Sequence, residues 1–460
     1  MTTELLSPLD QAFWHIESEG HPMHLGALGH FTANRPGAAR HAARLLAERC
    51  AEVPQLRRRI GDVLFPLGAA AWRPDPDFDP SRHIHLVPAG RSDPDVYAVA
   101  GELMARPLER GRPPWEAYVL EGRNPAAWVG TPFAVLFKFH HALADGLGAL
   151  ALAATLFDQG AERTPPRRPA NRTVPAQSSP AVTPELLLPD PRRLPGALLS
   201  RLHGRMQDVG QALEIGAAVA RAGLPSTAPA ALIADAVGGT RTIAGVRFDI
   251  DEVHLIRKSA GGTVNDVLIA VVAGALRRWL QTRGEPVRDV APRALIPVSR
   301  RRPNGGAGGA NRLSGYLIRL PVGNPDPLGR LAAVRADMDR NKEAGPARGA
   351  GAVALLADHV PALGHRLGGP VVAQAARLLY DVLVTSVPLP GIGLSLGGST
   401  LRQVYPLAPL ARGQSLAVAV STYRGAVHFG LLADGGAVPD LAPLAQAVRE
   451  ELALLRRSTQ

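Results

Sequence analysis

Hydrophobic and polar positions follow two different spacings along this chain. Short apolar runs rich in β-branched or aromatic residues predict strands at 133–139, 242–250, 293–298, 313–322, 382–386, 415–422 and 426–432. Longer patterns with a helical period predict helices at 147–157, 265–283, 327–342, 351–365, 371–380 and 440–456. Because these elements lack the regular βαβ alternation of a doubly wound sheet, we expect a mixed α/β (α+β) fold.

A stretch poor in aliphatic residues divides the chain. Pro, Arg, Ser and Thr dominate residues 161–195, a composition that cannot form a core. We therefore predict one domain at 1–160 and another at 241–460, joined by a Pro/Arg-rich linker and helical crossover at 161–240. In that crossover, residues 198–222 predict either a helix packed on the body or a basic amphipathic helix resting on lipid.

Composition and charge narrow the class of protein. With 46% hydrophobic and 20% charged residues the chain is typical of a globular protein, and its net charge is +11. Arginine carries nearly all of the positive charge, and the cations are scattered. No recognition-helix, zinc-finger or RNA-binding motif accompanies them, so we expect no nucleic-acid partner. A phosphate-rich substrate such as CoA, or an anionic lipid surface, suits this charge.

The single cysteine, Cys50, excludes an intramolecular disulfide framework and fits a reducing cytoplasm. Residues 1–10 lack the pattern of a signal peptide. The longest apolar runs, 147–157 and 267–276, fall short of the roughly 20 residues that cross a membrane. We expect a cytoplasmic protein whose membrane contact, if any, is peripheral and on the inner face.

The most unusual motif follows the aromatic strand at 133–139. His140 and His141 are adjacent, with Asp145 and Gly146 completing the motif. A strand end holds its last side chains rigidly and on opposite sides, so one histidine can face a substrate while the other braces the turn. Imidazole can take a hydroxyl proton and return it to a leaving group. A purely structural pair of buried histidines fits these residue types equally well.

Thr263, Asn265 and Asp266 introduce the apolar helix at 265–283. All three residue types are favoured at helix starts, so capping explains them. Asn265 could equally direct its amide, or the helix its free N–H groups, toward an oxyanion or a phosphate. The sequence alone leaves both interpretations open.

Other kinds of site have weaker support. Residues 393–397 read Gly-Leu-Ser-Leu-Gly, but a proline-rich segment precedes Ser395, and His428 comes before Asp434, the reverse of the esterase order. The spacing of His83 and His85 is more simply a strand with one polar face, and we expect no metal site. No nucleotide-binding glycine loop is present.

The order of short blocks along the chain resembles the bacterial wax ester synthase/acyl-CoA:diacylglycerol acyltransferases, within the chloramphenicol acetyltransferase-like superfamily that includes condensation domains. The matching blocks are 6–10, 22–26, 77–83, 106–116, the HHxxxDG motif at 140–146, 265–266, 297–300, 311–314 and 413–430. Three departures concern the acyl and alcohol preference: Pro113 stands where the family has leucine, Ser386 where it has asparagine, and 231–240 lacks an Asn-rich segment.

The resemblance implies two chloramphenicol acetyltransferase-like domains with an active-site channel between them. His141 would be the general base that deprotonates the hydroxyl of diacylglycerol or a long-chain alcohol, which attacks acyl-CoA without an acyl-enzyme. His140, Asp145 and Gly146 would support the motif. Acyl-CoA is a substrate, and no cofactor is expected.

The second domain would contribute Asn265 and Asp266 to the site, with Asn265 as the candidate oxyanion donor. Trp115, Ser299 and Arg300 are candidate substrate-binding residues, and Arg300 is also a candidate partner for Asp145. A membrane or lipid-droplet surface is the expected location of the acceptor. A catalytically inactive acyl-CoA or lipid-binding protein, and a serine esterase, remain as alternatives.

Overall fold

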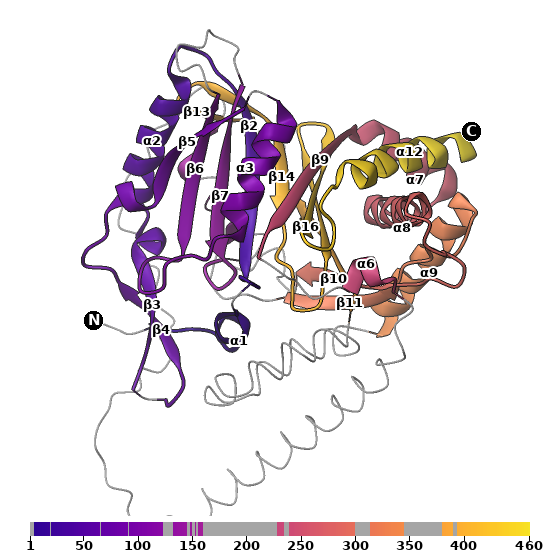
Figure 1. Ribbon diagram of the computed structural model, residues 1–460, viewed down its shortest axis with the longest axis horizontal. Helices are drawn as coiled ribbons and strands as arrows, with labels where there is room; N and C mark the ends of the chain where they lie inside the picture. The colour runs from indigo at the N-terminus through magenta and orange to yellow at the C-terminus, as the bar shows by residue number, and fades with distance from the viewer. Residues whose placement is uncertain are drawn as a thin grey trace, which may run out of the picture.

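Two mixed β-sheets lie side by side, one built mainly from each half of the chain (Figure 1). The computed structural model describes residues 4–18, 20–64, 66–90, 92–122, 132–144, 148–149, 152, 155–159, 228–233, 239–299, 313–344, 380–389 and 393–460. Both sheets combine parallel and antiparallel pairs, which confirms the mixed fold class predicted from the sequence.

The first sheet has seven strands. Their order is β5 (Ile84–Ala89), β6 (Trp115–Gly122), β7 (Pro132–His140), β2 (His24–Thr32), β14 (Ser399–Leu407), β13 (Leu394–Leu396) and β8 (Asp158–Gln159). Alternate residues of β7 face opposite layers, as a period of two requires. Phe133 and Phe139 pack with helix α2 (Ala38–Glu52), whereas Leu136 packs with helix α3 (Asp93–Ala105) and the second half.

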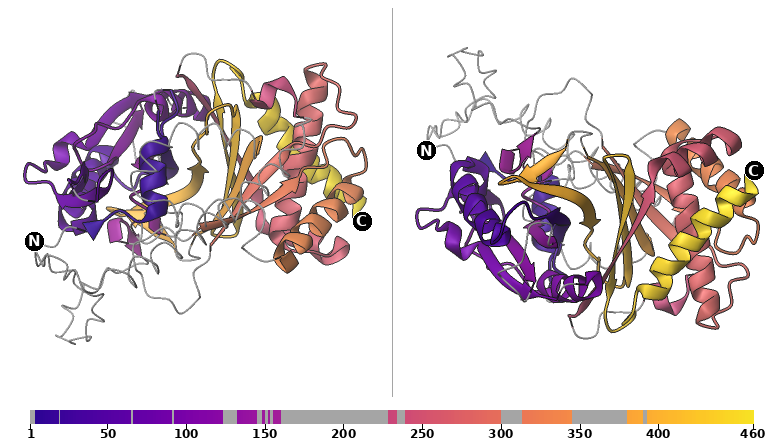
Figure 2. Two further views of the ribbon diagram at one scale, coloured as in Figure 1. Left: turned by 90° about the horizontal axis from the view of Figure 1, so that it is seen from below. Right: turned by 90° about the horizontal axis from the view of Figure 1, so that it is seen from above.

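The second sheet has six strands and a helical layer. Its order is β11 (Leu313–Arg319), β10 (Arg293–Ser299), β12 (Val382–Pro388), β15 (Leu416–Tyr423), β16 (Ala426–Asp434) and β9 (Arg241–Asp249). Its helices are α6 (Ala230–Ile233), α7 (Ile250–Ala260), α8 (Val264–Thr282), α9 (Pro327–Ala344) and α12 (Ala442–Ser458). The longer helices cover the sheet face that is turned away from the first half (Figure 2).

A small three-stranded sheet lies below the first one. It contains β1 (Glu4–Leu5), β4 (Ala70–Pro74) and β3 (Arg58–Asp62), and helix α1 (Pro8–Ile16) packs beside it. Two short 3-10 turns, Pro54–Arg57 and Pro80–Arg82, precede β3 and β5. Ser7 caps α1 by accepting the backbone N–H of Asp10 at 3.2 Å, and Pro8 occupies the first turn, where a missing N–H costs nothing.

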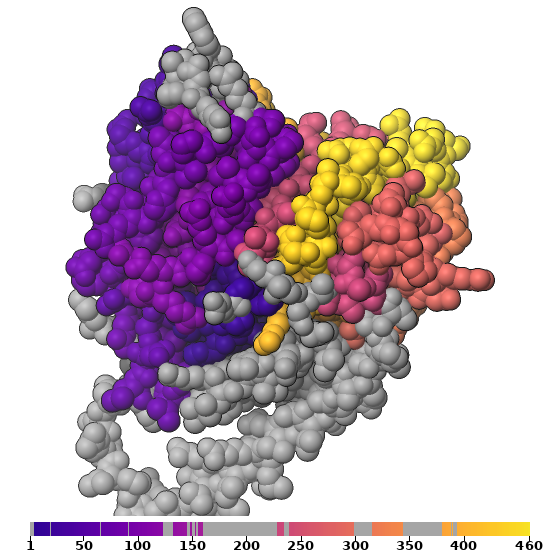
Figure 3. Space-filling model, in the orientation of Figure 1, coloured from indigo at the N-terminus to yellow at the C-terminus, as the bar shows by residue number. Residues whose placement is uncertain are grey.

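The two halves exchange strands. After β12 in the second sheet, the chain crosses to form β13 and β14 in the first sheet, where β14 pairs antiparallel with β2. Residues of both halves therefore share one apolar core, in which Leu28 and Leu136 meet Ile243 and Leu432. In the space-filling view the two halves adjoin each other directly (Figure 3). The predicted domain boundaries at 160 and 241 stay predictions. They did not anticipate that residues 394–407 of the second half join the first sheet.

The strands and helices predicted at 133–139, 242–250, 265–283, 382–386 and 426–432 are confirmed, each to within a few residues, by β7, β9, α8, β12 and β16. The predicted elements at 198–222, 351–365 and 371–380 lie outside the described residues, as does most of 147–157. Within the described part of the chain, no single helix is long and apolar enough to cross a membrane; α7 and α8 pass that test only together, and they meet at a bend of 99°.

Candidate active site

Backbone hydrogen bonds hold the end of β7 on both sides. His24 of β2 lies opposite His140 in antiparallel register. The His140 amide donates to the Pro114 carbonyl at 2.9 Å, and the His141 amide donates to the Met23 carbonyl at 2.9 Å. The two histidines are thus anchored to neighbouring segments of chain, which limits the directions in which their rings can point.

His140 is a buried and electrically neutral residue. Its side chain is 1% exposed, and its Nδ1 accepts the backbone N–H of Ala142 at 3.0 Å. Burial lowers the pKa of His140 to about 3, although Glu17 acts in the opposite direction. Because Nδ1 accepts a hydrogen bond, the single proton of the neutral ring lies on Nε2, which is 3.9 Å from Glu17 Oε1.

His141 occupies a different environment. It is half-buried, and its ring stacks on Phe13 of α1 with centroids 3.9 Å apart and planes 20° apart. The neighbouring residue of α1, Trp14, meets His140 edge to face at a centroid distance of 5.1 Å. Two consecutive aromatic residues of α1 therefore position the rings of two consecutive histidines.

Glu17, which follows α1, is the charged centre of this cluster. Its Oε1 lies 3.2 Å from His24 Nε2, and its Oε2 accepts from Arg110 at 3.0 Å. Burial would raise the pKa of Glu17, but the hydrogen-bond contact with His24 and the charge of Arg110 act in the opposite direction and hold the pKa below its usual value. The carboxylate is therefore ionised at any ordinary pH, and it stabilises the proton on the nearby imidazole nitrogens.

The loop between Glu17 and β2 is also fixed to the second half. Arg241, the first residue of β9, donates to the Gly20 carbonyl at 2.6 Å and pairs with Asp434 at 3.1 Å. The Met23 amide donates to Glu17 Oε1 at 3.2 Å. These contacts place the α1–β2 loop, and with it the histidine pair, beside the junction of the two halves.

The two histidines can therefore do different chemistry. A base needs an accessible lone pair, and His140 has none, because Nδ1 is engaged by Ala142 and the ring is almost fully buried. His140 can only brace the turn. Of the pair, His141 is the ring that the described structure leaves partly exposed, so it is the candidate base.

Asn265 and Asp266 begin α8 in the helical layer of the second half. Thr263 Oγ1 accepts the Asp266 amide at 3.2 Å, and Asp266 Oδ2 accepts the Thr263 amide at 2.7 Å, a reciprocal capping box. The capping interpretation thus applies to Asp266. A direct role of Asn265 in oxyanion stabilisation stays a prediction.

Of the predicted substrate-binding residues, only Trp115 has a described side chain. It is fully buried, stacks on His83 at 4.6 Å and donates from Nε1 to the Leu56 carbonyl at 2.7 Å. This packing, on the α2 side of the sheet, does not support a contact between its indole and substrate. Ser299 ends β10 opposite Leu313, and its side chain lies outside the described structure. Asp145, Gly146 and Arg300 also lie outside the described residues.

Sequence reasoning did not single out five members of the cluster: Phe13, Trp14, Glu17, His24 and Arg110. A signal existed, because Glu17 lies between the two N-terminal blocks at 6–10 and 22–26, and Arg110 lies inside the block at 106–116. The sequence could not assign partners to them, since Glu17 and Arg110 are 93 residues apart.

The serine motif at 393–397 has no esterase geometry. Ser395 lies in the short strand β13 and pairs with Thr400 across a tight turn at Gly397 and Gly398. An esterase nucleophile needs a strand followed by a helix. This serine is followed by another strand instead.

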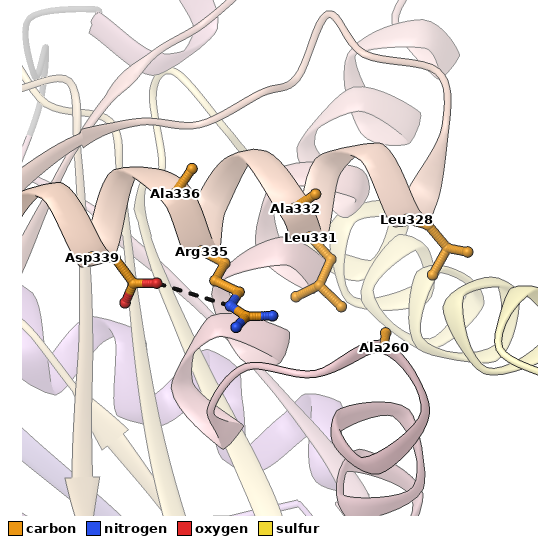
Figure 4. A pocket seen from close by; sticks show the side chains of 7 residues that line it. All are labelled: Ala260, Leu328, Leu331, Ala332, Arg335, Ala336 and Asp339. Carbon is orange, nitrogen blue, oxygen red and sulfur yellow. Dashed lines mark ion pairs between the residues drawn. The ribbon is translucent and has the colours of Figure 1, made fainter.

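The described part of the chain offers little beyond the histidine cluster. Within the described residues, no group of three His, Cys, Asp or Glu side chains could hold a metal ion. A shallow hollow lies between α9 and the end of α7, where Leu328, Leu331, Arg335 and Asp339 line it together with three alanines (Figure 4). Arg335 and Asp339 form an ion pair at 3.8 Å across one turn of α9. None of the predicted catalytic residues lines this hollow.

Comparison with known proteins agrees with this architecture. The family model of the wax ester synthase/diacylglycerol acyltransferase catalytic domain matches residues 6–268, and the model of the C-terminal domain of the same family matches 309–456. A probable diacylglycerol O-acyltransferase of Mycobacterium tuberculosis (strain ATCC 25618 / H37Rv) is 30% identical over 419 residues, which cover 89% of this chain and 86% of the relative.

Solved structures match the fold over nearly the whole chain. The wax ester synthase/diacylglycerol acyltransferase from Marinobacter aquaeolei VT8 superposes with a TM-score of 0.69 at 21% identity, covering 99% of both chains. The starter condensation domain of rhizomide synthetase superposes with a TM-score of 0.54 at 15% identity, covering 100% of this chain and 94% of that one. The chain belongs to the wax ester synthase/diacylglycerol acyltransferase family.

Proposed function

We propose that the protein transfers a long-chain acyl group from acyl-CoA to the hydroxyl of diacylglycerol, with a long-chain alcohol as the second candidate acceptor. Family membership supports the reaction class, and the names of the mycobacterial relatives support diacylglycerol as the first acceptor to test. The observation that carries the assignment is the contrast between a buried, neutral His140 and a half-buried His141 stacked on Phe13.

In the proposed mechanism His141 is the general base. It takes the proton of the acceptor hydroxyl as the oxygen attacks the thioester carbonyl, and a tetrahedral oxyanion forms. When the C–S bond breaks, the imidazolium returns the proton to the CoA sulfur, so that the ester and free CoA leave and the imidazole is neutral again. No acyl-enzyme forms, and no cofactor takes part beyond acyl-CoA as a substrate.

Asn265 is the proposed donor to the oxyanion, and Glu17 and His140 are positioning residues that act through the turn. We also propose peripheral contact with a membrane or lipid-droplet surface, because both candidate acceptors are apolar. The net charge of +11 supports attraction to an anionic surface.

Release of free CoA tests the proposal. Wild-type protein should release CoA from a long-chain acyl-CoA only when an acceptor alcohol such as diacylglycerol or a long-chain alcohol is added, and His141→Ala should lower the rate by about 100-fold or more. The control is His254→Ala, in α7 of the second half, which should keep the wild-type rate.

Two results would contradict the proposal. If His141→Ala retains most of the activity, His141 is not the base. If wild type binds acyl-CoA but releases no CoA with either acceptor, the protein is an acyl-CoA or lipid-binding member of the family. A serine-directed probe that labels wild type but not Ser395→Ala would instead favour the esterase alternative.

A further inference from the structure

The hairpin formed by β3 and β4 ends in an exposed apolar tip. Between the strands, residues 63–67 read Val-Leu-Phe-Pro-Leu. Leu64 is 93% exposed and Leu67 is 62% exposed, the two largest exposures among the large hydrophobic residues of the described chain. The hairpin projects from the lower edge of the molecule, away from both large sheets (Figure 1). Isolated exposed leucines are ordinary, but two within one projecting turn indicate a contact surface.

An ordered turn holds these leucines outward. The Val63 amide donates to the Ala69 carbonyl, and the Ala69 amide donates to the Pro66 carbonyl, both at 3.0 Å. Gly68 has a φ of 83°, which glycine adopts without strain, and its carbonyl accepts from Gln11 of α1 at 2.8 Å. The exposure of Leu64 and Leu67 is therefore a property of the folded hairpin.

Arginines lie behind the tip on both sides of the hairpin. Arg57 and Arg59 precede it and Arg73 follows it, and Asp62 is the one acidic residue between 57 and 74. Arg58 is paired with Glu4 of β1 at 2.7 Å. Arg59 lies opposite Arg73 across the hairpin and also reaches the Gly111 carbonyl at 3.3 Å. An apolar tip with a basic collar matches the layers of an anionic lipid surface, where hydrocarbon lies beneath phosphate headgroups.

The hairpin is packed against the active-site helix. Ile60 and Ala70 form one apolar cluster with Leu6 and Trp14 of the α1 region and with Ala142, the residue after His141. A surface that holds the hairpin tip therefore also holds α1 and the turn after His141 at a fixed position relative to it.

We propose that the hairpin tip inserts Leu64 and Leu67 into an anionic lipid surface, with Arg57, Arg59 and Arg73 against the headgroups, and so presents the His141 site to an acceptor dissolved in that surface. The purpose assigned to this docking rests on the proposed acyltransferase function. The docking itself does not, since it follows from the exposure, charge and packing of the hairpin.

Flotation of the full-length chain with vesicles tests the docking. We expect Leu64→Ser/Leu67→Ser to lower the partition coefficient on vesicles of phosphatidylcholine and phosphatidylserine by about 10- to 100-fold, because two aliphatic side chains no longer enter the hydrocarbon. The matched control is Leu255→Ser in α7, since Leu255 is 52% exposed but lies in the second half. That variant should bind as wild type does.

The basic collar has a separate readout. Arg57→Gln/Arg73→Gln should weaken binding to the mixed vesicles by about tenfold or more, and the loss should disappear on vesicles of phosphatidylcholine alone or at high salt. Equal loss on both kinds of vesicle would overturn the role given to the arginines.

Kinetics separate docking from catalysis. The leucine double variant should lose most of its CoA release with diacylglycerol in vesicles, yet keep the wild-type rate with a water-soluble short-chain alcohol. Unchanged vesicle binding by the double variant, or an equal loss in Leu255→Ser, would overturn the inference. So would a change in oligomeric state in solution confined to the double variant, which would make the tip an interface between copies. Failure of wild type to acylate any alcohol would contradict the proposed function and leave the flotation result standing.

Discussion

The ring of Phe13 lies nearly parallel to the ring of His141, with centroids 3.9 Å apart and an interplanar angle of 20°. Phe13 belongs to α1 and His141 follows β7, so the contact joins segments that are 128 residues apart in sequence numbering (141 − 13). The candidate base is thus held by a helix near the start of the chain.

Phe13→Ala should lower kcat by about tenfold without a large loss of stability. The stacking contact is worth about 0.5–1.5 kcal/mol, and without it the imidazole samples orientations in which it cannot take the hydroxyl proton. Steady-state CoA release with a water-soluble alcohol measures kcat and KM separately. Phe13→Tyr, which keeps the ring, should restore the rate; equal activity of Phe13→Ala and wild type would show that the stacking is irrelevant.

Glu17→Gln should destabilise the protein by about 1–3 kcal/mol and lower activity. The substitution removes the charge that contacts His24 and Arg110 in a site where Glu17 is 14% exposed. Urea unfolding measures the loss. Glu48→Gln is the control, because the Arg44–Glu48 pair at 2.9 Å is exposed and should contribute less than about 0.5 kcal/mol. If the two variants lose equal stability, the cluster around Glu17 has no special importance.

Stability should fall as the pH drops from about 7 to about 4. His428 is fully buried in β16, and burial, together with the charges of Arg247 and His30, lowers its pKa from 6.5 to about 4. Since the folded pKa is the lower one, the unfolded chain binds the proton first. The contribution of neutral His428 to the free energy of unfolding is therefore complete above pH 6.5. It disappears as the pH approaches 4, a loss of about 3 kcal/mol.

Denaturation curves of wild type and His428→Gln across this pH range isolate that contribution. The variant should start from a lower stability but show a weaker dependence on pH. Identical pH dependence in both proteins would mean that His428 does not titrate in this range. His140, with a pKa of about 3, should add a similar decline in both proteins.

Substitutions at the start of α8 should separate capping from catalysis. Asp266→Ala removes one partner of the capping box with Thr263 and should cost about 1 kcal/mol of stability. Asn265→Ala should leave the stability within about 0.5 kcal/mol of wild type but lower kcat by about 100-fold if its amide binds the oxyanion. Unfolding curves and CoA release on both variants provide the measurement. Full activity of Asn265→Ala would remove it from the proposed mechanism.

Elements with a strong local pattern were predictable. The run at 133–139 became β7, and the apolar helix at 265–283 became α8, because periodicity and capping residues are read within a few turns of chain. The pairing of β14 with β2 was not predictable, because nothing in the sequence of residues 399–407 specifies a partner strand more than 300 positions away.

The site divides in the same way. The apolar run at 133–139 followed by His140 and His141 was enough to predict that a histidine pair ends a strand, and the order of the blocks along the chain indicated the family. The difference in burial between the two histidines, which supports His141 as the proposed base, is visible only in the tertiary structure. Burial keeps His140 neutral and the Ala142 amide engages its Nδ1, while Phe13 holds His141 at the partly exposed side. The burial of each histidine and the charges around it depend on segments that meet only in the folded protein, so no local sequence pattern predicts them.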